Sequence, residues 1–372
     1  MDTIEPMVVP HPATGAPSPE GGEPPPPSLR RLWWAVPALL AVAVVGILLN
    51  LDLPYYGIAP GDARAVDDLI AAPEGYDHPA RGHVYYATVS LQQLKPLGVL
   101  RGWLDDDIDV VHEDELLGNT PRREYRRQNL RLMDDSKQTA LVVALRELGH
   151  DVKEYGRGAL VVTVAEDLPA AGRLEEGDTI VAIDGESTFL VQDAVEAIKA
   201  HRPGDEVRLE VVSADDEPRV EQITLAERDG GAILGVTMRT KDRRFDLPLD
   251  VSIDSGTIGG PSAGLAFTLG VIDRLSAGEL TGGRNVAVTG TIDIDGTVGD
   301  VGGVVQKTAA VKSKGVRYFL VPPGEFEQAR RHAGRHLQVI KVGSVDEAIE
   351  ALGRIGGDID GLDRSAVGQE QD

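Results

Sequence analysis

One serine stands in a glycine-rich setting that suits a nucleophile. Ser262 lies within Gly-Pro-Ser-Ala-Gly at 260–264, which satisfies the pattern G-x-S-x-G. A serine hydroxyl attacks a carbonyl carbon efficiently only when a neighbouring base accepts its proton. The pattern therefore predicts acyl-transfer chemistry and requires a base elsewhere in the chain.

Histidine does not fit as this base. In a nucleophile elbow the serine follows a buried strand at a sharp turn, and the histidine comes later in the sequence. Residues 249–254 alternate apolar and polar side chains, which predicts a half-buried strand, and residues 255–261 separate them from Ser262. The histidines that follow are His332 and His336, in an arginine-rich stretch typical of a solvated helix surface. We therefore expect a different base.

A lysine on the apolar side of a later helix is the better candidate. Residues 302–315 begin and end with glycine and predict a helix. Val304, Ala310 and Val311 lie three or four positions from Lys307 and share its face. Burial among aliphatic side chains lowers the pKa of a lysine, which can then act as a general base. The alternative for Lys307 alone is a side chain that extends to the surface.

The backbone before and at the serine suits oxyanion binding. Gly259 and Gly260 let the chain bend, and a helix is expected from Ala263. Backbone N–H groups at a helix start can hold a developing oxyanion, and we expect Gly260, Ser262 and Ala263 to provide them. The alternative is that the glycines only permit the turn.

These segments together resemble the proteolytic domain of the Lon family, which uses a serine–lysine dyad. The matching stretches are GPSAG at 260–264, VTGTI at 288–292 and GTVGDVGGVVQKTAAVKSKG at 296–315. The resemblance implies Ser262 as the nucleophile, Lys307 as the general base and Thr289 as the residue that helps position the lysine. Many Lon proteases carry an acidic residue where this chain has Gly259, so no role of that carboxylate is carried over.

A β-rich segment at 155–228 resembles a PDZ domain, notably in LEEGDTIVAIDG at 174–185 and a helix at 193–201. A PDZ domain binds an extended peptide by strand addition, beside a loop that receives a C-terminal carboxylate. The resemblance places that loop at Gly156, Arg157, Gly158, Ala159 and Leu160. A purely architectural role is the alternative.

The N-terminal region predicts a membrane anchor. Residues 32–49 carry no charge and, at ~1.5 Å per residue, span roughly 27 Å as a helix, close to a bilayer core. Arg30 and Arg31 precede this run and Asp52 follows it, which favours a cytoplasmic N-terminus. A cleaved signal peptide usually has a shorter apolar core, and the residues around the arginine pair fit a twin-arginine signal weakly.

The composition argues against several other functions. A net charge of -23 disfavours nucleic-acid binding. The chain has no cysteine, which removes thiol catalysis and cysteine-bound zinc. The acidic run 105–107 lacks the ligand spacing of a calcium loop and predicts a solvated surface. Without the phosphate-binding pattern G-x-x-x-x-G-K, we expect no nucleotide, and we expect no metal or other cofactor.

An α+β fold follows, with a Lon-type proteolytic domain, a PDZ-like domain inserted in it or preceding it, and one N-terminal transmembrane helix. The helix at 135–149 resembles an earlier helix of the proteolytic domain and favours the insertion. The expected segments are a disordered cytoplasmic N-terminus (1–29), the transmembrane helix (30–52), a linker (53–80), the first part of the protease domain (81–154), the PDZ domain (155–228), the catalytic part (229–355) and a disordered acidic tail (356–372).

This combination resembles bacterial membrane-anchored, PDZ-containing Lon-like proteases. The resemblance implies a serine endopeptidase that needs no ATP, with its catalytic domain outside the cytoplasmic membrane. It also implies unfolded, membrane or secreted polypeptides as substrates and a homo-oligomeric ring, such as a hexamer. The alternatives are a non-catalytic PDZ scaffold with an inactive protease fold and an unrelated serine hydrolase of small esters.

Overall fold

The computed structural model describes residues 29–360 and residue 362. The predictions for residues 1–28 and for most of the acidic tail lie outside the described residues. Residues 356–360 and Leu362 do not fit the predicted disordered tail, because Asp358 N donates to Glu279 O at 2.8 Å and Leu362 is buried in the main core.

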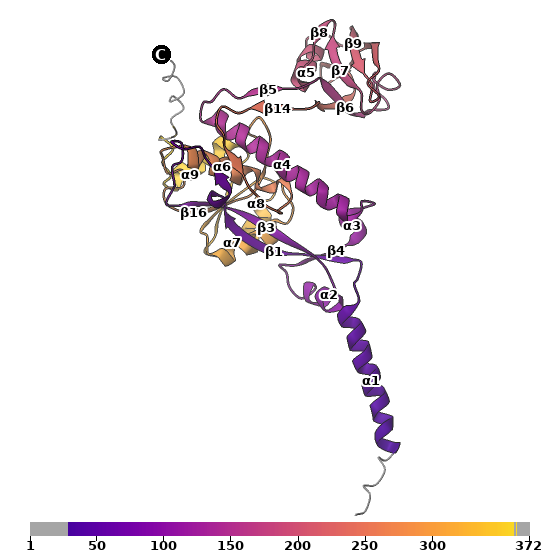
Figure 1. Cartoon of the computed structure of the whole chain (residues 1–372), viewed down its shortest axis with the longest axis vertical. Coiled ribbons are helices and arrows are strands. Elements are labelled where there is room, and N and C mark those ends of the chain that lie inside the picture. The colour runs from indigo at the N-terminus through magenta and orange to yellow at the C-terminus, as the bar shows by residue number, and fades with distance from the viewer. Residues whose placement is uncertain (1–28, 361, 363–372) are drawn as a thin grey trace, which may run out of the picture.

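A six-stranded mixed sheet forms the centre of the main body of the chain (Figure 1). Its strands in spatial order are β20 (Gln338–Lys341), β19 (Tyr318–Val321), β16 (Asn285–Val288), β3 (His83–Gln93), β1 (Tyr55–Ala65) and β4 (Asp109–His112). The pairs from β20 to β3 are parallel, and β1 runs antiparallel to both β3 and β4. Two small ladders pair β2 (Ile70–Ala71) with β15 (Ser252–Ile253) and β17 (Thr291–Ile292) with β18 (Val298–Gly299).

Helices cover both faces of this sheet, which fits the predicted mixed α/β content. The larger core lies under α4 (Arg122–Glu147), α6 (Gly264–Leu275) and α9 (Val345–Arg354). A smaller core on the other face lies under α7 (Val304–Lys314) and α8 (Phe326–His332). Val286 and Val288 belong to the first core and Ala287 to the second, so β16 is buried on both sides. The remaining short helices of the body are η1 (Asp67–Leu69), α2 (Pro96–Gly102), α3 (Glu113–Leu117) and η2 (Pro261–Ala263).

The predicted linker at 53–80 is wrong for its first part. Residues 55–65 form β1, a strand between β3 and β4 in the main sheet. Pro60 and Gly61 suggested a linker, but they lie at an irregularity where the pairing with β3 shifts between Pro60 and Ala63. A bulge accommodates proline within a sheet because the ladder is interrupted there. The predicted strand at 83–90 is confirmed as part of β3.

A second sheet forms the PDZ-like domain, which is inserted between α4 and the catalytic segment (Figure 1). Its strands in spatial order are β10 (Pro218–Thr224), β9 (Glu206–Val212), β7 (Thr179–Ile183), β6 (Ala159–Val164) and β13 (Val236–Thr240), with α5 (Val191–Lys199) beside them. The short strands β8 (Glu186–Ser187), β11 (Ala226–Arg228) and β12 (Gly231–Ile233) complete the domain. The predicted end at residue 228 is therefore too early, because β13 pairs with β6.

Two antiparallel strands connect this domain to the main body of the chain. They are β5 (Lys153–Tyr155) and β14 (Arg244–Asp246), which we call the stalk. Arg243 Nε donates to Glu154 Oε1 at 2.7 Å across the stalk. In Figure 1 the PDZ-like domain stands away from the body at the end of the stalk.

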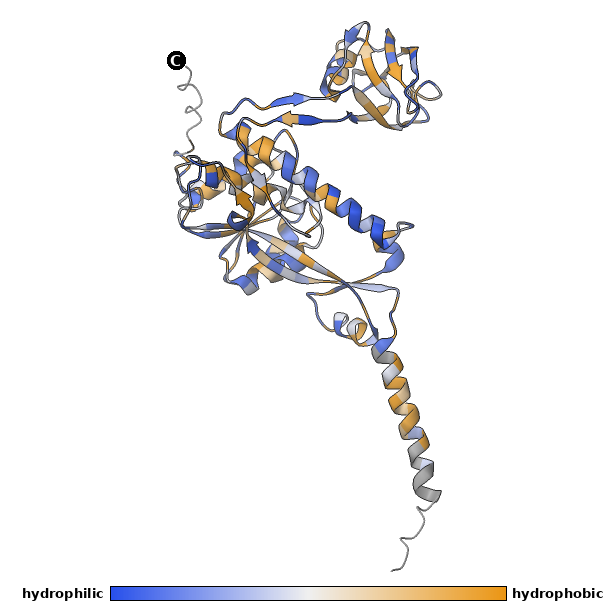
Figure 2. Cartoon of the chain, in the orientation of Figure 1, coloured by the Kyte–Doolittle hydropathy of each residue, from blue (hydrophilic) through white to orange (hydrophobic). Residues whose placement is uncertain are grey.

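Helix α1 (Leu29–Asn50) covers the predicted transmembrane segment and projects from the body (Figure 1). Figure 2 shows that its middle is strongly apolar. Within the part of the chain that the structure describes, however, no helix is both long enough and apolar enough to cross a membrane.

Asp273 near the end of α6 should make stability depend on pH. The residue is 1% exposed, and its Oδ1 accepts a hydrogen bond from Leu280 N at 2.8 Å. Its Oδ2 has no hydrogen-bond partner among the described residues. Burial raises the pKa of Asp273 to about 7, so the folded protein holds this proton more tightly than the unfolded chain.

The stabilising contribution of the Asp273 proton is present below the unfolded pKa near 4 and is lost as pH rises through about 7. The loss amounts to at most about 4 kcal/mol. We expect Asp273→Asn to unfold at higher urea concentration than the wild type at pH 8 and to differ less at pH 4.5. Urea unfolding at the two pH values measures this, and an equal difference at both would contradict the prediction.

Candidate active site

Ser262 lies in the single turn η2 that leads directly into α6. Gly260 just before it has φ +96° and ψ 145°, a conformation that favours glycine. Helix α4 holds this turn in place from the other side, because Gly260 N donates to Asn129 O at 2.8 Å and Ser136 Oγ donates to Pro261 O at 3.0 Å. Two hydrogen bonds with α4 thus hold the backbone at Gly260, just before the turn, and at Pro261, the first residue of the turn.

The predicted oxyanion donors differ in their availability. Gly260 N–H already donates to Asn129 O, so it is not free to hold an oxyanion. The N–H groups of Ser262 and Ala263 donate no hydrogen bond within the described part of the chain. They lie at the start of α6, where a helix favours negative charge. These two groups fit the predicted role, and Gly260 serves the turn instead.

Lys307 lies on the buried face of α7, as the helix pattern predicts. The side chain is 2% exposed, and Val304, Ala310 and Val311 are buried on the same helix. Gly303 and Gly315 bound the helix, both with left-handed backbone conformations. The lysine therefore does not extend to the surface.

Thr289 joins the two predicted catalytic residues by hydrogen bonds. Lys307 Nζ donates to Thr289 Oγ1 at 3.2 Å, and Thr289 Oγ1 donates to Ser262 O at 3.2 Å. Gly290 N also donates to Ser262 O, at 3.0 Å. No direct hydrogen bond joins the Ser262 hydroxyl to Lys307 among the described residues, and such bonds often form only when substrate is bound. The structure thus brings Ser262, Thr289 and Lys307 into one connected site.

The electrostatics of the site favour a neutral lysine. Burial lowers the pKa of Lys307 to about 8, and the negative charge of Glu325 partly opposes this effect. About a tenth of the amine is therefore unprotonated at pH 7, far more than for an ordinary lysine. His332 and His336, the candidates for a histidine base, lie on and after α8 and form no hydrogen bond with Ser262.

Removing the Thr289 hydroxyl should weaken catalysis without unfolding the protein. Thr289→Val deletes the acceptor for Lys307 and the donor to Ser262 O while keeping a similar shape. The loss of a hydrogen bond to a charged group should lower kcat about tenfold to hundredfold. Steady-state peptide cleavage measures the effect, with Thr289→Ser as the control that retains the hydroxyl. A kcat for Thr289→Val equal to that of the wild type would show that the hydroxyl has no role.

An apolar cleft of about 360 Å³ reaches the loop before Ser262. It lies between strands β1 and β3 and the N-terminal half of α4, with Arg122 and Arg126 also lining it. Its apolar and loop residues include Val89, Leu91, Leu117, Tyr125, Thr257 and Gly259.

The sequence did not reveal this cleft, nor the contacts of Asn129 and Ser136 with the serine loop. Asn129, Ser136 and all the cleft residues except Thr257 and Gly259 lie more than a hundred positions before Ser262 in the sequence, and no local pattern connects them with it. The one sequence pattern that bears on these contacts is the predicted helix around Ser136. It places Ser136 on the same helix face as the buried Ala140 and Val143.

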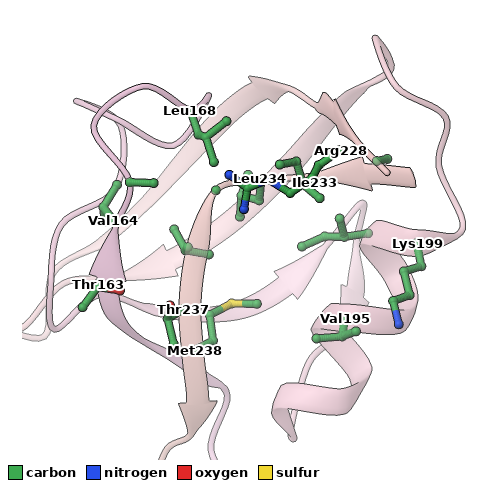
Figure 3. A pocket seen from close by; sticks show the side chains of 15 residues that line it. Thr163, Val164, Leu168, Val195, Lys199, Arg228, Ile233, Leu234, Thr237 and Met238 are labelled. Carbon is green, nitrogen blue, oxygen red and sulfur yellow. The ribbon is translucent and has the colours of Figure 1, made fainter. Parts of the chain in front are cut away.

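The PDZ-like domain has a pocket of about 340 Å³ between β13 and α5 (Figure 3). Strand β13 is at the edge of its sheet and pairs only with β6, so its outer side is open. Leu234 and Gly235 line the pocket, and their N–H groups donate no hydrogen bond among the described residues. Arg228 and Lys199 add two cations to its lining.

The predicted peptide-binding loop lies elsewhere in this domain. Gly156, Arg157, Gly158, Ala159 and Leu160 do not line the pocket. The backbone of this loop is instead paired, because Gly158 N donates to Phe189 O and Arg157 N donates to Lys241 O, both at 2.9 Å. The pocket comes from the segment 231–240, which the sequence pattern had assigned to the catalytic part.

Comparison with known proteins assigns both domains. Residues 239–353 match the Lon protease (S16) C-terminal proteolytic domain, and residues 146–221 match the PDZ domain. The Lon protease of Chloroflexus aggregans is 33% identical over 99 residues, which cover 26% of this chain and 12% of that protein. The Lon protease of Phenylobacterium zucineum is 32% identical over 121 residues, covering 32% and 15%.

Further similarities are equally partial. Lon protease 2 of Bacillus subtilis is 28% identical over 119 residues, covering 32% of this chain and 20% of that protein. The chain thus spans only 12 to 20% of the length of these Lon proteases. The PDZ domain of the SdrC-like protein of Listeria innocua is 31% identical, with 22% of this chain and 92% of that domain covered and a TM-score of 0.21. The similarity to the Lon-type proteolytic domain thus covers residues 239–353, and the similarity to the PDZ domain covers residues 146–221 of the same chain.

Proposed function

We propose that this chain is a serine endopeptidase in which Lys307 is the general base for Ser262. The observation that carries the proposal is the hydrogen-bond chain from Lys307 Nζ through Thr289 Oγ1 to the carbonyl of Ser262. The buried setting of Lys307 and its lowered pKa supply a base that is partly neutral at physiological pH. The Lon protease relatives agree with peptide-bond hydrolysis as the reaction.

The reaction proceeds through an acyl-enzyme. Lys307 accepts the Ser262 proton as Oγ bonds to the substrate carbonyl carbon, and the N–H groups of Ser262 and Ala263 stabilise the oxyanion. The Lys307 ammonium then protonates the leaving amine as the peptide C–N bond breaks. Lys307 next takes a proton from water, whose oxygen attacks the ester carbonyl carbon. It then returns this proton to Ser262 Oγ as the ester C–O bond breaks, which restores the free enzyme.

No step in this sequence needs a nucleotide. The chain contains no G-x-x-x-x-G-K pattern, and the two proton transfers use groups already present at the site. We therefore propose that unfolded polypeptides are cleaved without ATP.

The test is cleavage of an unfolded protein such as reduced, carboxymethylated lactalbumin in the absence of ATP. The wild type should cleave it, and Ser262→Ala should not. Equal cleavage by both would disprove the nucleophile. Absence of cleavage by either would favour the non-catalytic scaffold, and turnover of small esters without peptides would favour the hydrolase.

The PDZ pocket supports a role in binding substrate polypeptides. A peptide can add as a strand to the open edge of β13, with its C-terminal carboxylate at the N–H groups of Leu234 and Gly235 near Arg228. Strand addition would hold a substrate within the same molecule as Ser262. We propose that this domain presents polypeptides to the catalytic domain.

An acidic substitution in this pocket should reduce the affinity for peptide. Val195 lines the pocket from α5, so Val195→Asp should weaken binding of an apolar-ended decapeptide at least about tenfold. Fluorescence anisotropy measures this, with Glu196→Ala on the exposed side of the same helix as the control. Amidation of the peptide's C-terminus should also weaken binding. If neither change has an effect, peptide binding in this pocket is ruled out.

The exposed apolar side chains of α1 support attachment to a lipid bilayer. Trp33, Leu39, Val42 and Ile47 are each more than 60% exposed, and exposure of such side chains to water is unfavourable. We propose that residues 32–49 anchor the protein with its catalytic domain outside the cytoplasmic membrane. Release of the full chain from membranes by alkaline carbonate would contradict this.

A further inference from the structure

A carboxylate from another element lies beside the helix that carries Lys307. Glu325 directly precedes α8, and its Oε1 accepts a hydrogen bond from Val301 N at 3.0 Å. Val301 lies just before Gly303, where α7 begins. Glu325 is therefore fixed to the start of the lysine helix, although it is distant from Ser262 and Thr289 in the sequence.

The second oxygen of Glu325 is poised for an electrostatic role. Oε2 is buried and no N–H group donates to it among the described residues, and the Asp300 carboxyl lies within hydrogen-bonding reach of the Glu325 carboxyl. A buried carboxylate oxygen without a donor is costly unless a positive charge lies within its field. Burial and the neighbouring Asp300 raise the pKa of Glu325.

Other charges near α7 do not serve this purpose. Asp109 on β4 accepts a hydrogen bond from Gln306 of α7 at 2.9 Å, and Asp300 neighbours Glu325. The other titratable or charged groups on the elements that pack most against α7 are Tyr55, Tyr56, Asp62 and Arg64 on β1, His83, Tyr85 and Tyr86 on β3, and Glu327, Arg330, Arg331 and His332 on α8. Asp62 pairs with Arg64 at 2.9 Å, and Glu327 pairs with Arg330 at 2.8 Å. Glu325 alone exerts a resolved charge effect on Lys307, and that effect raises the lysine's pKa.

The proposed reaction needs a counter-charge at one stage. When Lys307 takes the Ser262 proton, an ammonium forms in a site that is almost closed to water, where charge is poorly solvated. The only hydrogen-bond acceptor of Lys307 Nζ among the described residues is the neutral Thr289 hydroxyl. A fixed anion near the start of α7 lowers the energy of this ammonium until its proton passes to the leaving amine.

We propose that Glu325 is a positioning residue of the catalytic site: its carboxylate is the counter-charge that stabilises protonated Lys307 between the two proton transfers. The proposal rests on the dyad chemistry proposed above. It assigns a second ionisable group to the site besides Lys307. This group directly precedes α8 and is not part of the serine loop, where position 259 is glycine.

The pH profile of kcat/KM for a short peptide tests this proposal. Activity should rise with pH as Lys307 loses its proton, giving an acid limb near pH 8. Glu325→Gln removes the counter-charge, so the acid limb should move to lower pH by about half to one unit. The plateau rate at high pH should fall severalfold, because a weaker base removes the proton less effectively. An unchanged limb or one moved upward would overturn the proposal.

Two further variants separate this effect from a structural one. Glu327→Gln makes the same chemical change two residues later, at an exposed residue paired with Arg330, and should leave the limb in place. Asp300→Asn removes the neighbour that raises the pKa of Glu325, so Glu325 is more fully ionised and the limb should stay or move upward. A downward shift in either variant would contradict the assignment.

A direct titration distinguishes failure of this proposal from failure of the proposed function. In the full chain with ¹³C-labelled lysine, the Lys307 signal is assigned by its loss in Lys307→Arg. Its titration midpoint should fall in Glu325→Gln even if the protein cleaves nothing, in which case the dyad function is wrong but the coupling stands. A midpoint unchanged by Glu325→Gln in an active enzyme would overturn the coupling alone.

Discussion

Lys307→Ala is expected to lower kcat for peptide cleavage by about 10³-fold or more while the protein stays folded. The amine is the only base joined to the Ser262 turn through hydrogen bonds in the described structure, and general-base catalysis typically contributes 10²- to 10⁴-fold. Loss of the base also removes the acid that protonates the leaving amine, so two steps suffer together.

We expect Lys307→Ala to lower kcat strongly but to change the free energy of unfolding little. A buried ammonium is costly, so its removal offsets part of the cavity that Ala leaves, and Lys307→Met would keep most of the volume. Lys312→Ala is the matched control, because Lys312 lies on the same helix but is exposed. If Lys307→Met retained more than about a tenth of wild-type kcat with an unchanged pH profile, Lys307 could not be the base.

Gly260→Val is expected to reduce kcat/KM at least about 10²-fold. The backbone of Gly260, at φ +96° and ψ 145°, is strained for any residue with a side chain, and a β-branched residue tolerates it least. The chain would relax by moving the turn, which breaks the bond from Gly260 N to Asn129 O and displaces Ser262. A displacement of about 1 Å is enough to cost two orders of magnitude in rate.

Gly256→Asn is the control for Gly260→Val. Gly256 lies in the same loop with φ +59°, has open space around it, and takes a left-handed conformation that asparagine accepts. The Gly256→Asn variant should retain a kcat/KM and a melting temperature close to those of the wild type. Comparable losses in both variants would show that the loop as a whole, rather than the geometry at Gly260, controls activity.

The parts of the site that were predictable are those set by local pattern. The spacing of Val304, Lys307 and Val311 places the lysine on the buried side of α7, and Gly303 and Gly315 bound that helix. Thr289 was predictable only through the resemblance of its segment to the Lon family. Its hydrogen bonds to Lys307 and Ser262 depend on three separate elements meeting, which no local pattern reports.

The incorrect predictions of a linker at residues 55–65 and of a peptide-binding loop before β6 have physical causes. Residues 55–65 contain Gly57, Pro60 and Gly61, which are poor strand formers, yet the sheet accepts them because the pairing of β1 with β3 is irregular between Pro60 and Ala63. In the PDZ domain, the loop before β6 has glycines and a cation as expected of a carboxylate site, but its N–H groups are already paired. The open edge belongs to β13, whose place in the sheet is set by its long-range pairing with β6.

The PDZ-like domain takes the place of the loop in a β-hairpin, because the two strands of the stalk on either side of it pair antiparallel. Tyr155 pairs with Arg244, so the chain leaves and re-enters the main body at adjacent points, about 5 Å apart as in any antiparallel ladder. Any independently folding domain whose two ends lie close together could occupy this position without changing the connectivity of the main sheet. The PDZ-like domain can thus be replaced by another binding domain at the stalk. The turn that carries Ser262 and the helix that carries Lys307 would keep their sequence and their contacts.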